Sequence, residues 1–191
     1  MGKAVLDVSL SLDGYITGPN DSREQPLGEG GTRLHEWVST TTQELMQGGT
    51  SATTGAIVTG RRTYDLVDGF GGSHRIAGAP VFVLTHDAPA TMPQGATPFT
   101  FVTDGIESAL KQAKAAAGEK QVYVMGSASI AGQCLQAGLL DEIQLHLVPM
   151  LLGGGIRLFD HLGTEPIELE TFRVIEAPGV THLGFRVVKA S

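Results

Sequence analysis

Three short segments of the chain combine residue types that can bind phosphate groups, and each directly follows a predicted strand. They are Gly60–Thr63 (GRRT), Thr85-His86 and Gly126–Ser129 (GSAS). Two adjacent guanidinium groups can form paired hydrogen bonds with phosphate oxygens. A helix that begins after a glycine turn presents free backbone N–H groups and the positive end of its dipole, which also suits a phosphate. The three segments therefore predict a phosphate-binding site, provided that the fold brings them together.

The elements that carry these segments are buried strands that alternate with helices. Strands are predicted over 4–12, 56–59, 80–85, 99–102, 121–125, 143–152, 167–175 and 182–189. Helices are predicted over 32–47 and 106–117, with shorter ones after Gly60 and Gly126. This order predicts an α/β fold with a central mixed, mostly parallel sheet, helices on both faces and a C-terminal antiparallel hairpin. Because ligands bind outside the carboxyl ends of strands in such sheets, the three segments are expected at one edge.

Each segment alone also has a simpler explanation. Arg61 and Arg62 can form part of a solvated face, and Ser127 or Ser129 can merely cap a helix. No GxGxxG or GxxxxGK[ST] pattern accompanies them, so the standard nucleotide-binding fingerprints are absent. Their coincidence at successive strand ends favours a nucleotide, with the two arginines on an additional phosphate such as the 2′-phosphate of NADP.

Length, charge and cysteine content limit the classes of protein. The 191 residues, 41% of them hydrophobic, are expected to form a single domain over 1–191. The net charge of −7 argues against nucleic-acid and membrane-surface partners. No apolar run is long enough for a membrane span, and the N-terminus does not resemble a signal peptide. Cys134 is the only cysteine and is expected to be buried, so neither a disulfide nor a zinc cluster is expected, and a reducing cytoplasm is the natural compartment.

Longer stretches resemble a known family. Ile57–Thr63, Val81–Thr85 and Val122–Gly126 are similar to the cofactor-side strand ends of the dihydrofolate reductase fold. Ala131–Phe159, with its AGLLDE and PMLLGGG runs, resembles the C-terminal reductase domain of the bifunctional riboflavin-biosynthesis deaminase–reductase. Ser9–Ile16 (SLSLDGYI) resembles the first strand and turn of that domain. The HxE and CxxC pattern of a zinc deaminase is absent, so the resemblance implies a stand-alone reductase domain.

The resemblance implies an NADPH-dependent oxidoreductase that transfers hydride to a pyrimidine- or pterin-like ring. The nearest activity is that of the 5-amino-6-(5-phosphoribosylamino)uracil reductases of the riboflavin pathway. By position, the resemblance implies that the 2′-phosphate and the diphosphate are held by Gly60, Arg61, Arg62 and Thr63. It implies that the adenine ribose is flanked by Thr85 and His86, and that the diphosphate is also wrapped by Gly126, Ser127, Ala128 and Ser129. The nicotinamide would be lined by Ser9 and Ile16.

The candidate catalytic and substrate-binding residues have alternative explanations. His146 is either a proton donor or a hydrogen-bonded histidine of the core or of a dimer interface. Asp13 either acts on the substrate, as the resemblance implies, or stabilises a turn. Tyr15 and Trp37 either stack on a substrate ring or belong to the core. Glu36 either replaces the helix acid that binds the pterin in dihydrofolate reductases or is an exposed helix residue.

The segment 143–152 is long and apolar for an exposed sheet edge. Such edges are usually paired or covered, and the similar reductases are commonly dimers, so a homodimer that uses this region is predicted. The glycines 153–155 are expected to form a turn, because no helix or lysine follows them. The expected partner besides a second copy is a small-molecule substrate. The alternative functions are an NADP-binding module without turnover and a true dihydrofolate reductase.

Overall fold

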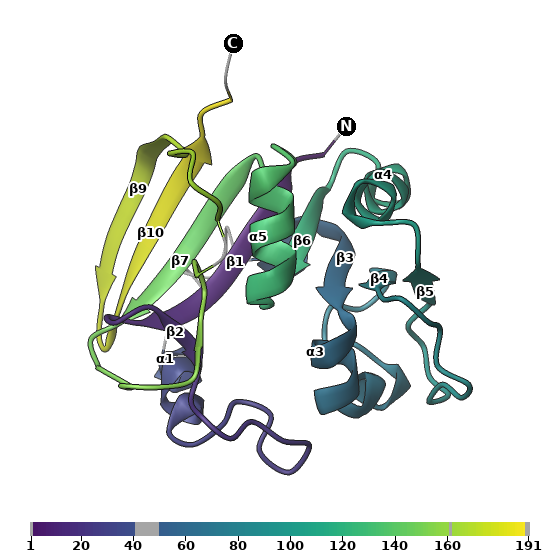
Figure 1. Cartoon of the computed structure of the whole chain (residues 1–191), viewed down its shortest axis with the longest axis horizontal. Helices are drawn as coiled ribbons and strands as arrows, with labels where there is room; N and C mark the ends of the chain where they lie inside the picture. Colours follow the sequence, from purple (N-terminus) through teal and green to yellow (C-terminus); the bar gives the residue numbers. More distant parts are fainter. Residues whose placement is uncertain (1, 41–49, 161, 190–191) are drawn as a thin grey trace.

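A single twisted sheet forms the centre of the molecule (Figure 1). The computed structural model of the chain describes residues 2–40, 50–160 and 162–189. The sheet has the strand order β5-β4-β3-β6-β1-β7-β10-β9. Its strands are β1 Ala4–Ser11, β3 Thr54–Gly60, β4 Val81–Leu84, β5 Phe99–Val102, β6 Gln121–Met125, β7 Glu142–Val148, β9 Leu169–Ala177 and β10 Val180–Val187. Two short strands, β2 Tyr15–Thr17 and β8 Ile156–Arg157, pair with each other beside it.

Strand β1 lies inside the sheet and pairs in parallel with β6 on one side and with β7 on the other. All neighbouring strands from β5 to β7 run in parallel, whereas β10 is antiparallel to β7 and β9 is antiparallel to β10. Strands of a parallel sheet are covered on both faces, which is why β1, β3 and β6 are rich in apolar residues. The predicted mixed, mostly parallel sheet with a C-terminal antiparallel hairpin is confirmed.

Helices cover both faces of this sheet. On one face lie α4 (Ile106–Ala117) and α5 (Ala128–Gln136), whose buried side chains pack against alternate residues of β1 and β6 such as Leu6 and Val124. The opposite face carries α3 (Arg61–Leu66), where Tyr64 packs against Ile57 and Tyr123. The 3-10 helix η1 (Gly31–His35) and helix α1 (Trp37–Thr40) cover the β7–β10 part of that second face. The remaining short helices are α2 (Thr50–Thr53) and η2 (Asp68–Gly72).

Several predicted elements agree with the structure. The bounds of β5, β6 and α4 are those predicted, and α3 and α5 begin directly after Gly60 and Ser127. Cys134 is fully buried on the inner side of α5. Among the helices of the described residues, none combines the length and the apolar character that a membrane span requires.

Two predictions are wrong. The first is the continuous helix over 32–47: its beginning is the 3-10 turn η1 followed by the short α1, and residues 41–49 lie outside the described part. The second is the edge strand over 143–152. Strand β7 ends at Val148 and is hydrogen bonded on both sides, to β1 and to β10, so it is an interior strand. The apolar character of β7 reflects its burial within the sheet. An exposed apolar edge therefore no longer supports the predicted homodimer.

Candidate functional site

A large cleft opens on the sheet face that carries α1 and α3. Its volume is roughly 1460 Å³, which exceeds the ~300–1,000 Å³ of a typical small-molecule pocket and leaves room for a dinucleotide together with a substrate. Strands β1, β6, β7, β9 and β10 form its floor, and the first residues of α3 and α5 form one wall. The cleft brings together these predicted site residues: Ser9, Ile16, Trp37, Arg62, Thr63, Gly126, Ser127, Ala128, Ser129 and His146.

The end of the cleft at α5 has the features of a phosphate site. Ser127 occupies the N-cap position of α5 in an extended conformation, and its side chain forms no capping hydrogen bond. Gly126 has a φ of 31° and open space where a side chain would begin, so the backbone of this turn faces the cleft unshielded. A Cβ at Gly60 would lie 3.2 Å from Ile130 and 3.3 Å from the Ser127 hydroxyl, which shows how closely the ends of β3 and β6 approach. The residues present therefore fit a dinucleotide diphosphate.

The two adjacent arginines have different surroundings. The Arg61 guanidinium binds the Asp65 carboxylate at 2.9 Å, the Asp87 carbonyl at 2.7 Å and, more weakly, the Thr85 hydroxyl at 3.5 Å. Arg61 thus connects the end of β3 to the end of β4. Arg62 is 64% exposed and forms an ion pair of 2.7 Å with Asp21.

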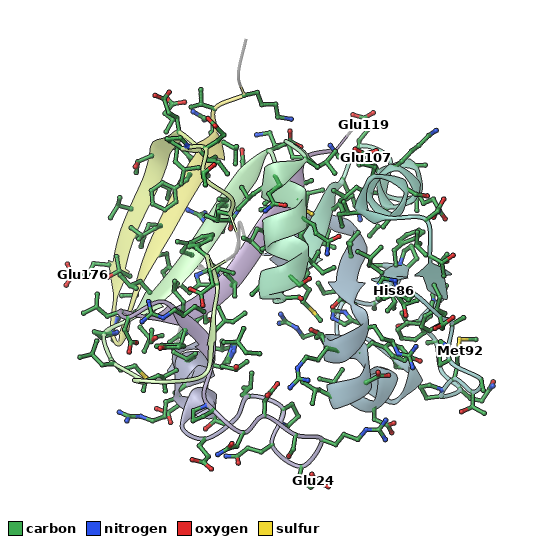
Figure 2. The ribbon with its side chains drawn as sticks, in the orientation of Figure 1. Glu24, His86, Met92, Glu107, Glu119 and Glu176 are labelled. Carbon is green, nitrogen blue, oxygen red and sulfur yellow. The ribbon has the colours of Figure 1, made fainter. Side chains whose placement is uncertain are left out.

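Arg62 therefore connects α3 to the loop over 18–30, which runs along the bottom of Figure 1 and whose Glu24 is labelled in Figure 2. A recess of roughly 330 Å³ beside the main cleft is lined by Arg23, Arg61, Arg62, Asp65 and Leu66, and its three arginines suit an additional phosphate.

The third predicted strand end contributes less to the cleft. The Thr85 hydroxyl is buried and hydrogen bonds to the Asp87 carbonyl at 2.8 Å. His86, labelled in Figure 2, is exposed at the surface. Neither side chain lines the cleft, so Thr85 acts on the site through Arg61 and not by direct contact.

A row of polar side chains crosses the sheet floor at the other end of the cleft. Asp7 and Ser9 of β1 lie in register with Gln144 and His146 of β7, and His146 lies in register with His182 of β10. All of them line the cleft. Asp7, Gln144 and His182 were not among the predicted site residues. The signal that could have revealed Asp7 is a charged residue inside an otherwise apolar central strand, because such a group is seldom buried without a role.

Hydrogen bonds hold this row in place. His146 Nε2 lies 3.0 Å from Asp7 Oδ1, and His146 Nδ1 lies 2.7 Å from His182 Nδ1. The Trp37 indole N–H donates to the Ser9 hydroxyl at 3.1 Å and to the Leu34 carbonyl at 3.0 Å. The centroid of the Trp37 ring lies 4.6 Å from that of His146 and 5.0 Å from that of His182, so Trp37 packs on the histidines of the floor, and its stacking on a substrate ring stays a prediction.

Two further arginines give the floor positive charge. Arg173 of β9 donates to the Gln144 side-chain carbonyl at 3.0 Å, and its buried Nε has no partner among the described residues. Arg75 hydrogen bonds to the hydroxyl of Tyr123, a residue whose pKa is raised by burial and by the charge of Asp7. Burial, Arg75 and His146 together lower the pKa of His35 at the rim. No carboxylate within the described ranges forms a salt bridge with Arg75 or Arg173, so both remain available to an anion.

Besides Gly60, Arg61, Thr85 and His86, the three predicted residues Asp13, Tyr15 and Glu36 do not line the cleft. Asp13 accepts hydrogen bonds from the Ser11 hydroxyl and from the backbone N–H groups of Leu152 and Gly153, and these bonds lower its pKa to about 2. These bonds give Asp13 a structural role in holding the glycine turn after β7, and its action on a substrate stays a prediction. The Tyr15 ring lies under the Arg157 guanidinium at 4.8 Å in the β2–β8 pair. Glu36 is exposed.

Comparison with known proteins places the fold and the family. The solved structure of a putative riboflavin biosynthesis protein from Shewanella sp. PV-4 aligns over 98% of this chain and 99% of its own, with a TM-score of 0.74 and 22% identity. The deaminase/5-amino-6-(5-phosphoribosylamino)uracil reductase of Thermotoga maritima aligns over 98% of this chain and 57% of its own, with a TM-score of 0.67 and 13% identity. The uncharacterized protein YwjB of Bacillus subtilis is 24% identical over 166 residues, which is 85% of this chain and 86% of YwjB.

The two solved structures share the dihydrofolate reductase-like fold predicted from the sequence. The model of the RibD C-terminal domain matches residues 3–181, nearly the whole chain. The chain belongs to the RibD C-terminal domain family.

Proposed function

We propose that this protein is an NADPH-dependent reductase that transfers hydride to a pyrimidine- or pterin-like heterocycle. The observation that carries the proposal is the continuity of one cleft. It joins a helix N-terminus with a nearby arginine, Arg62, to a polar sheet floor that includes Asp7 and His146. Membership of a reductase family supports the same conclusion.

The chain's own residues suit the two ends of NADPH. The backbone of Gly126–Ser129 would bind the diphosphate, and Arg62 with Arg23 would bind the 2′-phosphate. Ile16 is 5% exposed and Ser9 is 3% exposed; both line the cleft and would orient the nicotinamide. When bound, NADPH supplies the hydride for the reduction.

The substrate end favours a ring that carries hydrogen-bonding groups and an anionic substituent. The Gln144 amide and the Asp7 carboxylate offer a donor and acceptors on the floor. Arg173 and Arg75 lack salt-bridge partners within the described part, which suits a phosphate. The substrate named for the Thermotoga maritima enzyme, a phosphoribosylamino-uracil, has both features. We therefore propose a phosphorylated pyrimidine as the substrate class.

The test is steady-state oxidation of NADPH with 5-amino-6-(5-phosphoribosylamino)uracil, with the same compound lacking its phosphate, and with dihydrofolate. We expect turnover of the phosphorylated pyrimidine and a KM at least about tenfold higher without the phosphate, since one charge-assisted contact is worth about 1.5–3 kcal/mol. Arg173→Gln should remove this difference. Arg186→Gln, on the exposed side of the same hairpin, should leave it unchanged. NADPH binding without oxidation of any compound would instead identify a nucleotide-binding module.

The assembly and location of the protein are also proposals. Similar reductases are commonly dimers, which supports a homodimer here. Light scattering of the purified chain tests this oligomeric state. A cytoplasmic location agrees with the single buried thiol of Cys134. Turnover of dihydrofolate faster than of the pyrimidine would favour the alternative of a true dihydrofolate reductase.

A further inference from the structure

A second polar row crosses the cleft floor beside the histidines and spans four strands. Gln144 of β7 lies in register with Asp7 of β1 on one side and with Gly184 of β10 on the other. Gly184 lies in register with Arg173 of β9, and Figure 1 shows the four strands side by side in the order β1-β7-β10-β9. Because position 184 carries no side chain, Arg173 reaches across β10 and donates to the Gln144 side-chain oxygen at 3.0 Å. A Cβ at Gly184 would lie only 3.1 Å from that of Arg173, so a larger residue would disturb this contact.

The bond from Arg173 fixes which end of the Gln144 amide faces the cleft. A guanidinium group carries donors only, so the amide oxygen faces Arg173 and the amide nitrogen lies on the side away from it. Gln144 lines the cleft and is 8% exposed. Its Nε2 forms no hydrogen bond with the described residues, and it is not among the fully buried atoms that lack a partner there. The amide therefore presents N–H groups to the open cleft.

Arg173 also prevents this amide from turning round. If the amide rotated by half a turn, its N–H donors would face the donors of Arg173, and both side chains would lose their hydrogen bond. A buried donor that loses its acceptor is costly, and Arg173 Nε already lacks one among the described residues. Gln144 is therefore a donor of fixed direction, whereas an unrestrained glutamine can offer either end of its amide to a ligand.

We propose that Gln144 is a specificity-determining residue that donates a hydrogen bond to a ring carbonyl oxygen of the substrate, and that Arg173 positions it. The inference rests on the proposed function and narrows its substrate class to oxo-pyrimidines. A carbonyl oxygen accepts the N–H of Gln144, whereas a ring amino group in the same place turns its own donors toward it. The lone pair of that amino nitrogen is delocalised into the ring, which makes the nitrogen a poor acceptor. The site therefore favours the oxo form of the ring over the amino form.

The experiment measures kcat/KM with NADPH for three compounds that differ at one ring position. They are 5-amino-6-(5-phosphoribosylamino)uracil and its 2-amino and 4-amino counterparts, each with an amino group in place of one ring carbonyl. The wild-type chain should use at least one counterpart about 10–100-fold less efficiently than the uracil, because a donor then faces a donor. All three compounds carry the phosphate, so a contact of Arg173 with that group cancels in the ratio.

Three variants separate recognition by Gln144 from the intrinsic reactivity of each compound. Gln144→Glu keeps an oxygen for Arg173 and presents a second oxygen, an acceptor, to the cleft, so it should reverse the preference. Arg173→Leu frees the amide to turn and should bring the ratio of the two kcat/KM values close to one. The matched control Gln112→Glu changes an exposed glutamine of α4 outside the cleft and should keep the wild-type ratio.

A second readout does not depend on turnover. Calorimetric binding of the three compounds to the chain saturated with NADP⁺ should give the same order of preference, and NADP⁺ binding shows that each variant is folded. Turnover of the uracil with a ratio unchanged in Gln144→Glu and Arg173→Leu would overturn the role of Gln144 and leave the proposed function standing. Binding without turnover, with a ratio that Gln144→Glu reverses, would refute the reductase function and support the recognition by Gln144. If no compound binds or reacts, both proposals are refuted.

Discussion

Arg62 should determine the preference of this protein for NADPH over NADH. The side chain lines both the cleft and the recess beside it, and its present partner is Asp21, on a loop. Arg61 is held by Asp65 and by the carbonyl of Asp87, which makes it part of the framework. The change Arg62→Ala should therefore weaken NADPH binding selectively, whereas Arg61→Ala should lower stability and affect both nucleotides equally.

The size of the effect follows from the exposure of the side chain. A hydrogen bond to a charged group contributes about 1.5–3 kcal/mol. Because Arg62 is 64% exposed, solvent screens the contact and the lower value applies, which corresponds to about tenfold weaker NADPH binding. The ion pair with Asp21 competes with the phosphate, and a surface pair is worth about 0.2–1 kcal/mol. Asp21→Asn should therefore strengthen NADPH binding by up to about fivefold.

Calorimetric titration with NADPH and NADH measures these affinities for the wild-type chain, Arg62→Ala, Asp21→Asn and Arg61→Ala. Arg33→Ala, an exposed arginine that does not line the cleft, serves as the control. The reasoning is refuted if Arg62→Ala weakens NADPH and NADH to the same extent. It is also refuted if Arg61→Ala alone changes the ratio of the two affinities.

Three more outcomes follow from buried or constrained positions. Gly60→Ala should destabilise the fold by about 1–3 kcal/mol in urea unfolding, because the new Cβ lies 3.2 Å from Ile130; Gly154→Ala, whose nearest neighbour is 3.9 Å away, should cost less. Hydrogen bonds lower the pKa of Asp13 to about 2, so the contribution of its carboxylate to stability is present above the ordinary aspartate pKa and is lost as pH falls through about 2. Asp13→Asn should therefore lower Tm at pH 7, and the difference in Tm from the wild-type chain should disappear near pH 2. Burial raises the pKa of Cys134 to about 12, so a thiol reagent should modify it only when urea unfolds the chain.

These outcomes can also fail in informative ways. Equal stability of Gly60→Ala and Gly154→Ala would contradict the close approach of β3 to α5. A Tm difference for Asp13→Asn that persists at pH 2 would mean that its effect does not depend on the carboxylate charge. Rapid modification of Cys134 in the folded chain would contradict its burial.

The sequence determined the order of elements, the sheet type and two strand-end segments, Gly60–Thr63 and Gly126–Ser129, that contribute residues to the cleft. Local patterns suffice for these features: β6 is a short apolar run that ends at Gly126, and α4 has a plain amphipathic repeat. Each predicted phosphate segment is contiguous, so its place at a strand end follows from the chain alone. The AGLLDE and PMLLGGG runs were enough to indicate the family, which the match over residues 3–181 shows.

Tertiary structure decided which of the candidate side chains meet. Asp13 had two explanations in the sequence, and the backbone N–H groups of residues 152 and 153, far along the chain, bind it outside the cleft. Strand β7 resembled an edge because apolar residues suit both an edge contact and an interior strand, and only pairing with β10 distinguishes them. The row formed by Asp7, His146 and His182 depends on the register of three strands, and register is a property of the assembled sheet that no local pattern encodes.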